Sequence, residues 1–241
     1  MIKKLPMWRG GYAPLMRLYD RRNYDMDGLE LLKRIPDASI PYVIFDPQYD
    51  HLLQHMKFGY KKGEGRMHKR VALPPQNAMD LWRFGQEIAR ILKPSGHVSL
   101  WMDTHILCET DPLEIFTDAE GNTEMNRVDL IVWDKIKMGL GARSRHQCEF
   151  FMTFQKNPKR AKGCWNSHSI RDVTPEAVRK THPHSKPVGL QAQLIKALVP
   201  KGGVVVDPTA GGFSTMIAAH SVGRRFLGCE FLKKNDPALL P

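Results

Sequence analysis

The sequence predicts an α/β fold: a Rossmann-like, doubly wound, mostly parallel sheet with an antiparallel hairpin at its edge. Helix-patterned and strand-patterned segments alternate along the chain, and two apolar runs, 42–45 and 204–206, stop at Asp-Pro. An apolar run that ends in this way is typical of a buried strand delivering a carboxylate to the carboxyl edge of a sheet. Ligands of open α/β sheets bind at that edge. We therefore expect two adjoining sites, at Asp46 and at Asp207.

The first half of the chain alternates helix and strand. Leucine and isoleucine residues at a loosely helical spacing over 28–35 lead into the strand 42–45. Apolar residues repeat at helical spacing over 78–92 and stop at the breaker 93–96, so a second helix is expected there. Residues 97–101 form the next expected strand.

The second half adds a hairpin and a βαβ unit. Residues 128–133 and 149–154 have strand patterns and a connection without a helix pattern, which predicts an antiparallel pair at the edge of the sheet. Residues 187–199 carry the apolar stripe of a helix. The final segments are strand 203–206, helix 213–222 and strand 226–229.

Length and charge limit the possible functions. The 241 residues fit one domain, 1–241, and the formal charge of +11, from 36 basic and 25 acidic residues, favours nucleic acid as the partner. No apolar stretch approaches the roughly 18 residues of a membrane span, and the first residues lack the apolar core of a signal peptide. We expect no membrane partner and a cytoplasmic, nucleoid-associated protein.

Cysteine and histidine spacing gives no sign of a metal site. The four cysteines form no C-x-x-C pair, which argues against a zinc knuckle and a disulfide framework. The histidines near residue 184 match no standard zinc spacing. We therefore expect no metal.

The carboxyl-terminal unit has the features of a nucleoside site. A glycine turn at Gly211 opens a helix near Thr215, and backbone amides at such a turn approach a ligand closely. The turn begins with the acidic Asp207, which would repel phosphate, so a cofactor with hydroxyl groups and an amino-acid tail fits better than ATP. Glu230, at the end of the next strand, suits a ribose diol. The alternative is an ordinary tight turn followed by a surface glutamate.

The segment Asp46-Pro47-Gln48-Tyr49 suits a planar base with an amino group. A carboxylate or backbone carbonyl can accept a hydrogen bond from that group while Tyr49 stacks on the ring, so that catalysis depends on orientation. The alternative is a turn at a strand end with a packing tyrosine.

Together these segments resemble the S-adenosylmethionine-dependent DNA amino-methyltransferases, which methylate N6 of adenine or N4 of cytosine. The family signature is Asp/Asn/Ser-Pro-Pro-aromatic, and in one permuted class, the beta type, it precedes the cofactor motif as Asp46 precedes Asp207 here. The resemblance implies a circularly permuted methyltransferase topology. It also covers Asp27-Gly28-Leu29-Glu30-Leu31-Leu32, His184-Ser185-Lys186-Pro187, Asp207-Pro208-x-x-Gly211, 223–230 and the hairpin 133–150.

The resemblance assigns roles to individual residues. Asp46 and the carbonyl of Pro47 would hold the target amino group, within a catalytic segment completed by Gln48 and Tyr49. The implied cofactor site, for S-adenosylmethionine, consists of Asp27 on the adenine side, His184, Lys186 at the helix entry, Asp207, Pro208, Gly211 and Thr215 on the methionine side, and Glu230 on the ribose.

The departures from the signature leave alternatives open. Gln48 stands where a second proline is usual, and Phe213 where a glycine or small residue is common. The leading Asp46 resembles the adenine-N6 branch, so adenine-N6 methylation of DNA is the first hypothesis. A cytosine-N4 enzyme, a catalytically silent DNA-binding subunit and an RNA substrate are the alternatives.

A basic segment follows the catalytic one. The resemblance implies that the target base flips out of the duplex, which requires contacts to the DNA strand on either side of it. We expect residues 50–77 to be a DNA-contacting loop, with a solvated loop as the alternative. The expected DNA contacts are Lys57, Lys61, Lys62, Arg66, Lys69, Arg70, Arg143 and Arg145.

The segment available for reading DNA sequence is short. Residues 155–185 are too few for a large recognition domain, which favours a short or relaxed site, and a homodimer is one way to supply more surface. Whether the chain works with a restriction enzyme cannot be read from the sequence.

Overall fold

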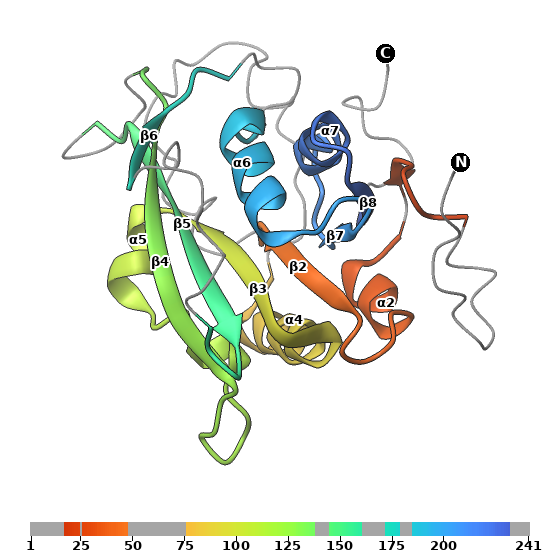
Figure 1. Ribbon diagram of the computed structural model, residues 1–241. Coiled ribbons are helices and arrows are strands. Elements are labelled where there is room, and N and C mark those ends of the chain that lie inside the picture. Colours follow the sequence, from red (N-terminus) through yellow and green to blue (C-terminus); the bar gives the residue numbers. More distant parts are fainter. Residues whose placement is uncertain are drawn as a thin grey trace, which may run out of the picture.

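The computed structural model describes residues 17–24, 26–47, 76–137, 145–160, 172–178 and 185–231. They form one eight-stranded sheet with the order β1-β8-β7-β2-β3-β5-β4-β6, packed between helices (Figure 1). Its strands are β1 (Asn23–Tyr24), β2 (Ile40–Phe45), β3 (Leu92–Met102), β4 (Met125–Asp134), β5 (Cys148–Lys156), β6 (Val173–Pro175), β7 (Val204–Asp207) and β8 (Arg225–Glu230). Its helices are α2 (Gly28–Lys33), α4 (Ala78–Ile91), α5 (Thr104–Glu109), the 3-10 turn η2 (Glu114–Phe116), α6 (Val188–Leu198) and α7 (Ser214–Ser221).

The parallel part of the sheet brings the ends of three strands together. Strands β1, β8, β7, β2 and β3 pair in parallel in that order. Val43 of β2 lies beside Val206 of β7, and Asp207 lies beside Gly228 of β8. The carboxyl ends of β2, β7 and β8 therefore meet at one edge, as the two Asp-Pro segments predicted.

Strand β2 shows why the sheet is covered on both faces. Its side chains alternate: Val43 and Phe45 pack in the core with α2 and α4, whereas Tyr42 and Ile44 pack in the core with α6 and α7. All four are at most 1% exposed. Burying a large apolar side chain contributes about 1.5–3 kcal/mol, so both helix layers are held to the sheet by this one strand.

The expected antiparallel hairpin is present, but it does not end the sheet. β4 pairs with β5 from Met125 opposite Lys156 to Asp134 opposite Cys148, and β5 also pairs antiparallel with β3. Strand β6 then adds in parallel to the outer side of β4 and takes the edge position. The sequence analysis was wrong on this point because three residues are too few to show a strand periodicity. For the same reason it missed β1.

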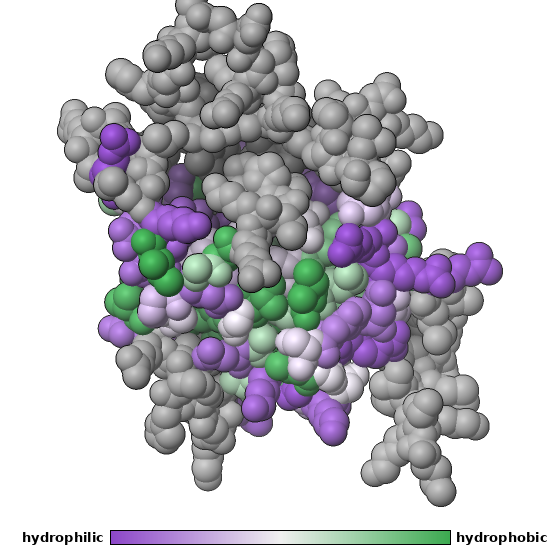
Figure 2. Space-filling view, turned by 90° about the horizontal axis from the view of Figure 1, so that it is seen from above, coloured by the Kyte–Doolittle hydropathy of each residue, from purple (hydrophilic) through white to green (hydrophobic). Residues whose placement is uncertain are grey.

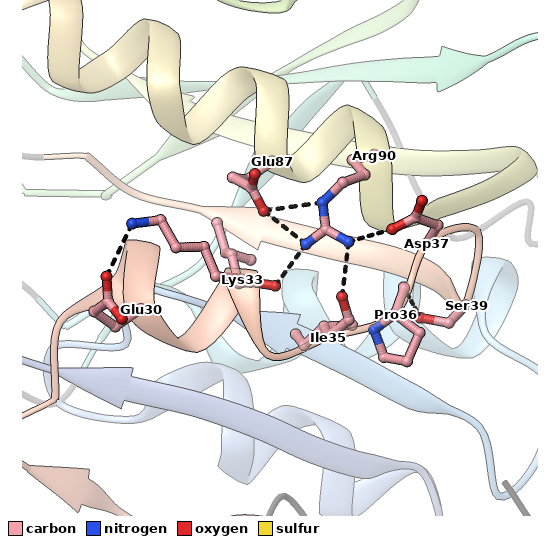
Figure 3. A network of polar contacts seen from close by, with 9 residues as sticks. Glu30, Lys33, Ile35, Pro36, Asp37, Ser39, Glu87 and Arg90 are labelled. Carbon is pink, nitrogen blue, oxygen red and sulfur yellow. Dashed lines mark hydrogen bonds and ion pairs between the residues drawn. The ribbon is translucent and has the colours of Figure 1, made fainter. Parts of the chain in front are cut away.

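Arg90, near the end of α4, ties that helix to α2 and to the start of β2 (Figure 3). Its guanidinium group donates to the carbonyl oxygens of Leu32 at 2.9 Å and Ile35 at 2.9 Å, which lie at the carboxyl end of α2. It also pairs with Glu87 and with Asp37. One half-buried side chain thus adds a hydrogen bond to the Leu32 carbonyl, which also accepts one from the backbone N–H of Ile35 at 2.9 Å, and binds the Ile35 carbonyl just beyond α2.

The surface is of mixed polarity. Figure 2 looks down on the molecule of Figure 1 and shows hydrophobic residues gathered near the middle, with hydrophilic residues around them. The exposed large apolar side chains include Met79 on α4, Val173 on β6 and Ile217 on α7, so they are spread over separate elements. Among the helices that the structure describes, none combines the length and apolar character needed to cross a membrane.

Candidate active site

Three carboxylates lie at the carboxyl edge of the sheet. Asp46 directly follows β2, Asp207 ends β7 and Glu230 ends β8. The backbone N–H of Asp46 donates to the hydroxyl of Thr209 at 3.1 Å, across the two loops. The segment expected to hold the base and the segment expected to hold the cofactor are therefore in direct contact.

Asp207 is a buried carboxylate held by its own loop. Its Oδ2 accepts a hydrogen bond from Thr215 Oγ1 at 2.6 Å, and its Oδ1 accepts one from the backbone N–H of Thr209 at 3.1 Å. Burial raises the pKa of Asp207 to about 7, and these two donors offset part of the effect. The charges of Asp46 and Glu230 raise it further.

Glu230 faces the glycine turn. Its Oε2 accepts a hydrogen bond from the backbone N–H of Gly211 at 2.6 Å. The turn is also anchored to β8 because Ala210 N–H donates to the Cys229 carbonyl at 2.9 Å. Burial raises the pKa of Glu230 to about 7, the Gly211 amide opposes the change, and the Asp46 charge adds to it.

The turn into α7 uses two residues with left-handed backbone. Gly211 has φ 48°, which costs glycine little, but Phe213 has φ 59° and carries a side chain. Phe213 is fully buried and packs edge-on against Tyr24 and Phe226, with ring centroids 5.1 Å and 6.0 Å away. Left-handed backbone costs an ordinary residue about 1–2 kcal/mol, so core packing holds this turn in its strained form.

Asp27 lies beside the same turn and caps a helix. Its Oδ1 accepts hydrogen bonds from the backbone N–H groups of Leu29 at 2.9 Å and Glu30 at 3.1 Å, at the start of α2. A Cβ on Gly28 would lie 2.4 Å from the carbonyl oxygen of Pro208, so the helix start packs directly on the turn. The expected contact of Asp27 with an adenine ring would use a side chain that already caps α2.

Lys186, two residues before α6, contacts the catalytic segment. Its ammonium nitrogen lies 3.1 Å from Asp46 Oδ1 and 2.8 Å from Glu149 Oε2. It also lies over the ring of Trp101, 5.1 Å from the centroid. On the far side, Lys135 Nζ lies 2.7 Å from Glu149 Oε1. An alternating row of charges therefore runs from β2 to the hairpin, which the expected cofactor role of Lys186 did not suggest.

The charges in this row are strongly coupled. Burial would raise the pKa of Glu149, but the ammonium groups of Lys186 and Lys135 outweigh it and hold that pKa at about 2. Burial would likewise lower the pKa of Lys186, and the carboxylates of Asp46 and Glu149 reverse the effect, so its pKa is raised. Lys186 and Glu149 are therefore both charged at neutral pH.

The surroundings of Asp46 favour its ionised form less than those of Glu149 do. Burial raises its pKa, the Lys186 charge opposes the rise, and the Glu149 charge adds to it. The net effect is a raised pKa despite a cation at 3.1 Å. The ionisation of this carboxyl group depends on its neighbours.

Some expected site residues lie outside the described part of the chain. These are Gln48, Tyr49, Lys57, Lys61, Lys62, Arg66, Lys69, Arg70, Arg143 and His184. Arg145 is described, and it is exposed three residues before β5. The structure brings together Asp46, Pro47, Lys186, Asp207, Pro208, Gly211, Thr215 and Glu230, with Asp27 beside the turn.

Three residues of the site had no assigned role in the sequence analysis. They are Glu149, Lys135 and Thr209. Glu149 could have been noticed as a charge at the start of an apolar strand. Its partners could not, because they come from the end of β4 and from the segment before α6, far away in the sequence.

Comparison with known proteins identifies the family. A family model described as DNA methylase, covering N6-adenine and N4-cytosine methyltransferases, matches residues 80–235, more than half of the chain. The chain belongs to this DNA methylase family. It is similar to the type II methyltransferase M.HhaII of Haemophilus parahaemolyticus, with 37% identity over 212 residues, covering 88% of this chain and 91% of that protein. It is also similar to the DNA adenine methyltransferase YhdJ of Escherichia coli, with 33% identity covering 85% of this chain and 76% of YhdJ.

Solved structures of DNA methylases share the fold. The M1.HpyAVI complex with S-adenosylmethionine aligns with a TM-score of 0.59 at 18% identity, covering 90% of this chain and 96% of that one. The cytosine-N4-specific PvuII DNA methyltransferase aligns with a TM-score of 0.60 at 16% identity, covering 91% of this chain and 87% of that one. The expected methyltransferase fold is thereby confirmed.

The family uses S-adenosylmethionine as its methyl donor, and the charges at the sheet edge fit that cofactor. Asp207 and Glu230 are buried carboxylates, and the pKa of each is raised partly by the charge of Asp46. A ligand with a sulfonium and an ammonium group would neutralise this excess of negative charge. Asp207, Gly211 and Glu230 are the residues of the described chain that suit it.

Proposed function

We propose that this DNA methyltransferase transfers the methyl group of S-adenosylmethionine to N6 of adenine. The observation that carries the proposal is the place of Asp46: it opens the catalytic segment and lies against the loop of Asp207. A leading aspartate resembles the adenine-N6 branch of the family. The 33% identity to YhdJ, which is named a DNA adenine methyltransferase, also supports adenine.

The mechanism depends on holding the amino group. Asp46 and the carbonyl of Pro47 accept hydrogen bonds from the two amino hydrogens, which directs the nitrogen lone pair toward the cofactor side of the edge, where Asp207 lies. The bound cofactor supplies an electrophilic methyl group. Asp207, Gly211 and Glu230 would hold the cofactor, which would give up its methyl group to the held nitrogen and leave as the thioether, and the amino group would then lose one proton. A strong general base is therefore unnecessary, and alignment provides most of the rate.

The target base must leave the double helix to reach this edge. An amino group inside a duplex is paired and stacked, so we propose base flipping, with Tyr49 stacking on the extruded ring. The basic residues of 57–70, together with Arg143 and Arg145, would bind the phosphates around it. We place the cofactor contact of His184 in the same proposal.

The decisive experiment incubates the protein with methyl-labelled S-adenosylmethionine and mixed-sequence duplex DNA, then digests the DNA for nucleoside mass spectrometry. The expected product is N6-methyladenine. N4-methylcytosine would move the target to the other branch of the family, to which the PvuII enzyme belongs by its name. No methylated base, with cofactor and DNA both bound, would overturn the proposal; labelled RNA tested alongside would reveal a different substrate.

A further inference from the structure

We propose that Lys186 is a positioning residue: its ammonium group keeps the Asp46 carboxylate charged and aimed at the target amino group. The inference deepens the proposed function and depends on it in one respect, that Asp46 accepts the hydrogen bond from the base. It differs from the role that the resemblance gave Lys186, a contact to the cofactor at the entry of a helix.

The contacts of Lys186 hold its ammonium group in one place. The side chain is 14% exposed and lies between those of Asp46, 29% exposed, and Glu149, 24% exposed. Its two ion pairs measure 3.1 Å and 2.8 Å, and the ring of Trp101 lies beneath it. By contrast, the pair of Lys33 with Glu30 has side chains 58% and 55% exposed, where water competes for both charges.

The groups around Asp46 explain why it needs a cation. The acidic groups coupled to it come from three strands: the charge of Glu149, in β5, raises the pKa of Asp46, and the charge of Asp46 raises the pKa of Asp207, in β7, and of Glu230, in β8. Lys186 opposes these negative charges from 3.1 Å away. Without it, a carboxyl group with little access to water would face three others, and the neutral acid would be favoured. A neutral Asp46 has lost the charge that strengthens its bond to an amino group.

Lys135 completes the arrangement from the hairpin. It pairs with the other oxygen of Glu149, so that Glu149 keeps its charge while bound to Lys186. Lys135 follows the end of β4 and Glu149 is the second residue of β5. The Asp46 segment is therefore connected by charges to the end of the hairpin from which the β4–β5 connection, with Arg145, begins.

The test compares Lys186→Met with Lys186→Arg in the full chain. The titration of the Asp46 carboxyl is followed by carbon NMR of labelled aspartate, assigned by the signal lost in Asp46→Asn. In Lys186→Met we expect the midpoint to move to higher pH, and turnover of DNA at pH 7 to fall about tenfold or more and recover as the pH rises. Lys186→Arg keeps the positive charge, so both values should lie closer to those of the wild type than in Lys186→Met, and the affinity for S-adenosylmethionine should change by less than about twofold in either variant.

Lys33→Met is the matched control because it removes a lysine from an exposed ion pair on α2. It should leave the Asp46 titration and the turnover unchanged. Should Lys186→Met fail to fold, Lys186→Gln carries the same prediction, since it keeps a donor and removes the charge. An unmoved Asp46 titration would overturn the inference, and lost cofactor affinity with that titration unmoved would make Lys186 a cofactor contact. If the wild type methylates no DNA, the proposed function fails while the NMR titration still tests Lys186.

Discussion

Thr215 donates a hydrogen bond of 2.6 Å to Asp207 from the first turn of α7. Both residues are buried, at 1% and 3% exposure, and they lie eight positions apart, at the two ends of the glycine turn. The hydrogen bond links the residue before the glycine turn to the first turn of the helix after it. The carboxylate is thus oriented before any ligand arrives, which reduces the cost of ordering it on binding.

Thr215→Val should weaken both the fold and cofactor binding. Valine has nearly the same shape but leaves Asp207 without its hydroxyl donor, and an unsatisfied buried acceptor costs about 1–3 kcal/mol. Urea unfolding and calorimetric binding of S-adenosylmethionine measure the two effects. Thr153→Val is the control: its buried hydroxyl contacts Ser99 at 2.7 Å, away from the turn, so stability should fall while cofactor affinity stays. Equal affinity in both variants would contradict the prediction.

Asp207 and Glu230 should make the free energy of unfolding decline as pH rises toward neutrality, against a smaller opposite contribution from His97, whose pKa burial lowers to about 4. Folding raises the pKa of Asp207 from 3.8 and that of Glu230 from 4.5, each to about 7. Below pH 3.8 both forms of the chain are protonated; between there and about 7 the unfolded chain releases protons that the folded chain keeps, so stability falls until pH passes the folded values. Urea unfolding without cofactor from pH 4 to 8 measures this decline.

Asp207→Asn with Glu230→Gln is the control for that decline. The double variant cannot titrate at these positions, so its stability should fall less between pH 4.5 and 7. A cationic cofactor should act in the opposite direction, because it binds the ionised carboxylates: its stabilisation of the wild type should grow with pH over the same interval. An identical decline in wild type and double variant would show that other groups cause it.

Asp46→Ala and Asp207→Ala should separate turnover from cofactor binding. Asp46→Ala should lose turnover and largely keep cofactor affinity, since its proposed task is to hold the base. Asp207→Ala should lose cofactor binding, since its carboxylate is proposed to bind the cofactor. Calorimetry with S-adenosylmethionine and single-turnover methylation measure the two properties. The reverse pattern would exchange the two assignments.

At position 213, glycine should be more stable than alanine. Both substitutions remove the buried phenyl ring, a loss of about 3–5 kcal/mol. Alanine retains the strain of φ 59°, whereas glycine adopts that backbone freely. The free energy of unfolding of Phe213→Gly should therefore be about 1 kcal/mol higher than that of Phe213→Ala. At Ala218, in the middle of α7, the order should reverse, because glycine destabilises a helix interior. Thermal unfolding of the variants measures the difference.

Arg90→Lys should destabilise the fold without changing the chemistry. Lysine cannot bind the carbonyls of Leu32 and Ile35 and the Glu87 carboxylate with one ammonium group, and each hydrogen bond lost costs about 0.5–1.5 kcal/mol. Turnover per folded molecule should equal that of the wild type. Arg83→Lys, in an exposed ion pair with Asp80, is the control and should change stability by less than about 0.5 kcal/mol. A loss for Arg83→Lys as large as for Arg90→Lys would contradict the proposed role.

The sequence predicted elements that are long and strongly patterned. The apolar run 42–45 and the helix expected over 78–92 correspond to β2 and α4, and Asp207 ends β7 beside Gly228 as an Asp-Pro strand end requires. β6 was missed because Val173–Pro175 has no visible period. The helix α5 was missed as well, although α2, which has the same length, was expected from its leucines.

Side-chain partners were harder to predict than positions. Lys186 was expected near the cofactor, and no pattern in its own segment indicated Asp46 or Glu149 as neighbours. Those contacts exist because β2 and β3 pair in parallel, β3 and β5 antiparallel, and the segment before α6 crosses their ends. Charge pairing between distant segments depends on the completed sheet, which sequence periodicity does not encode.

The two ends of strand β2 lie beside residues with different roles, the stabilising contacts of Arg90 and the carboxyl group of Asp46. It begins beside the contacts of Arg90 and ends at Asp46, six residues or roughly 20 Å away at about 3.3 Å per residue. Substitutions this far apart usually have additive effects. Heat resistance can therefore be changed at one end of β2 without disturbing the proposed base-holding residue at the other.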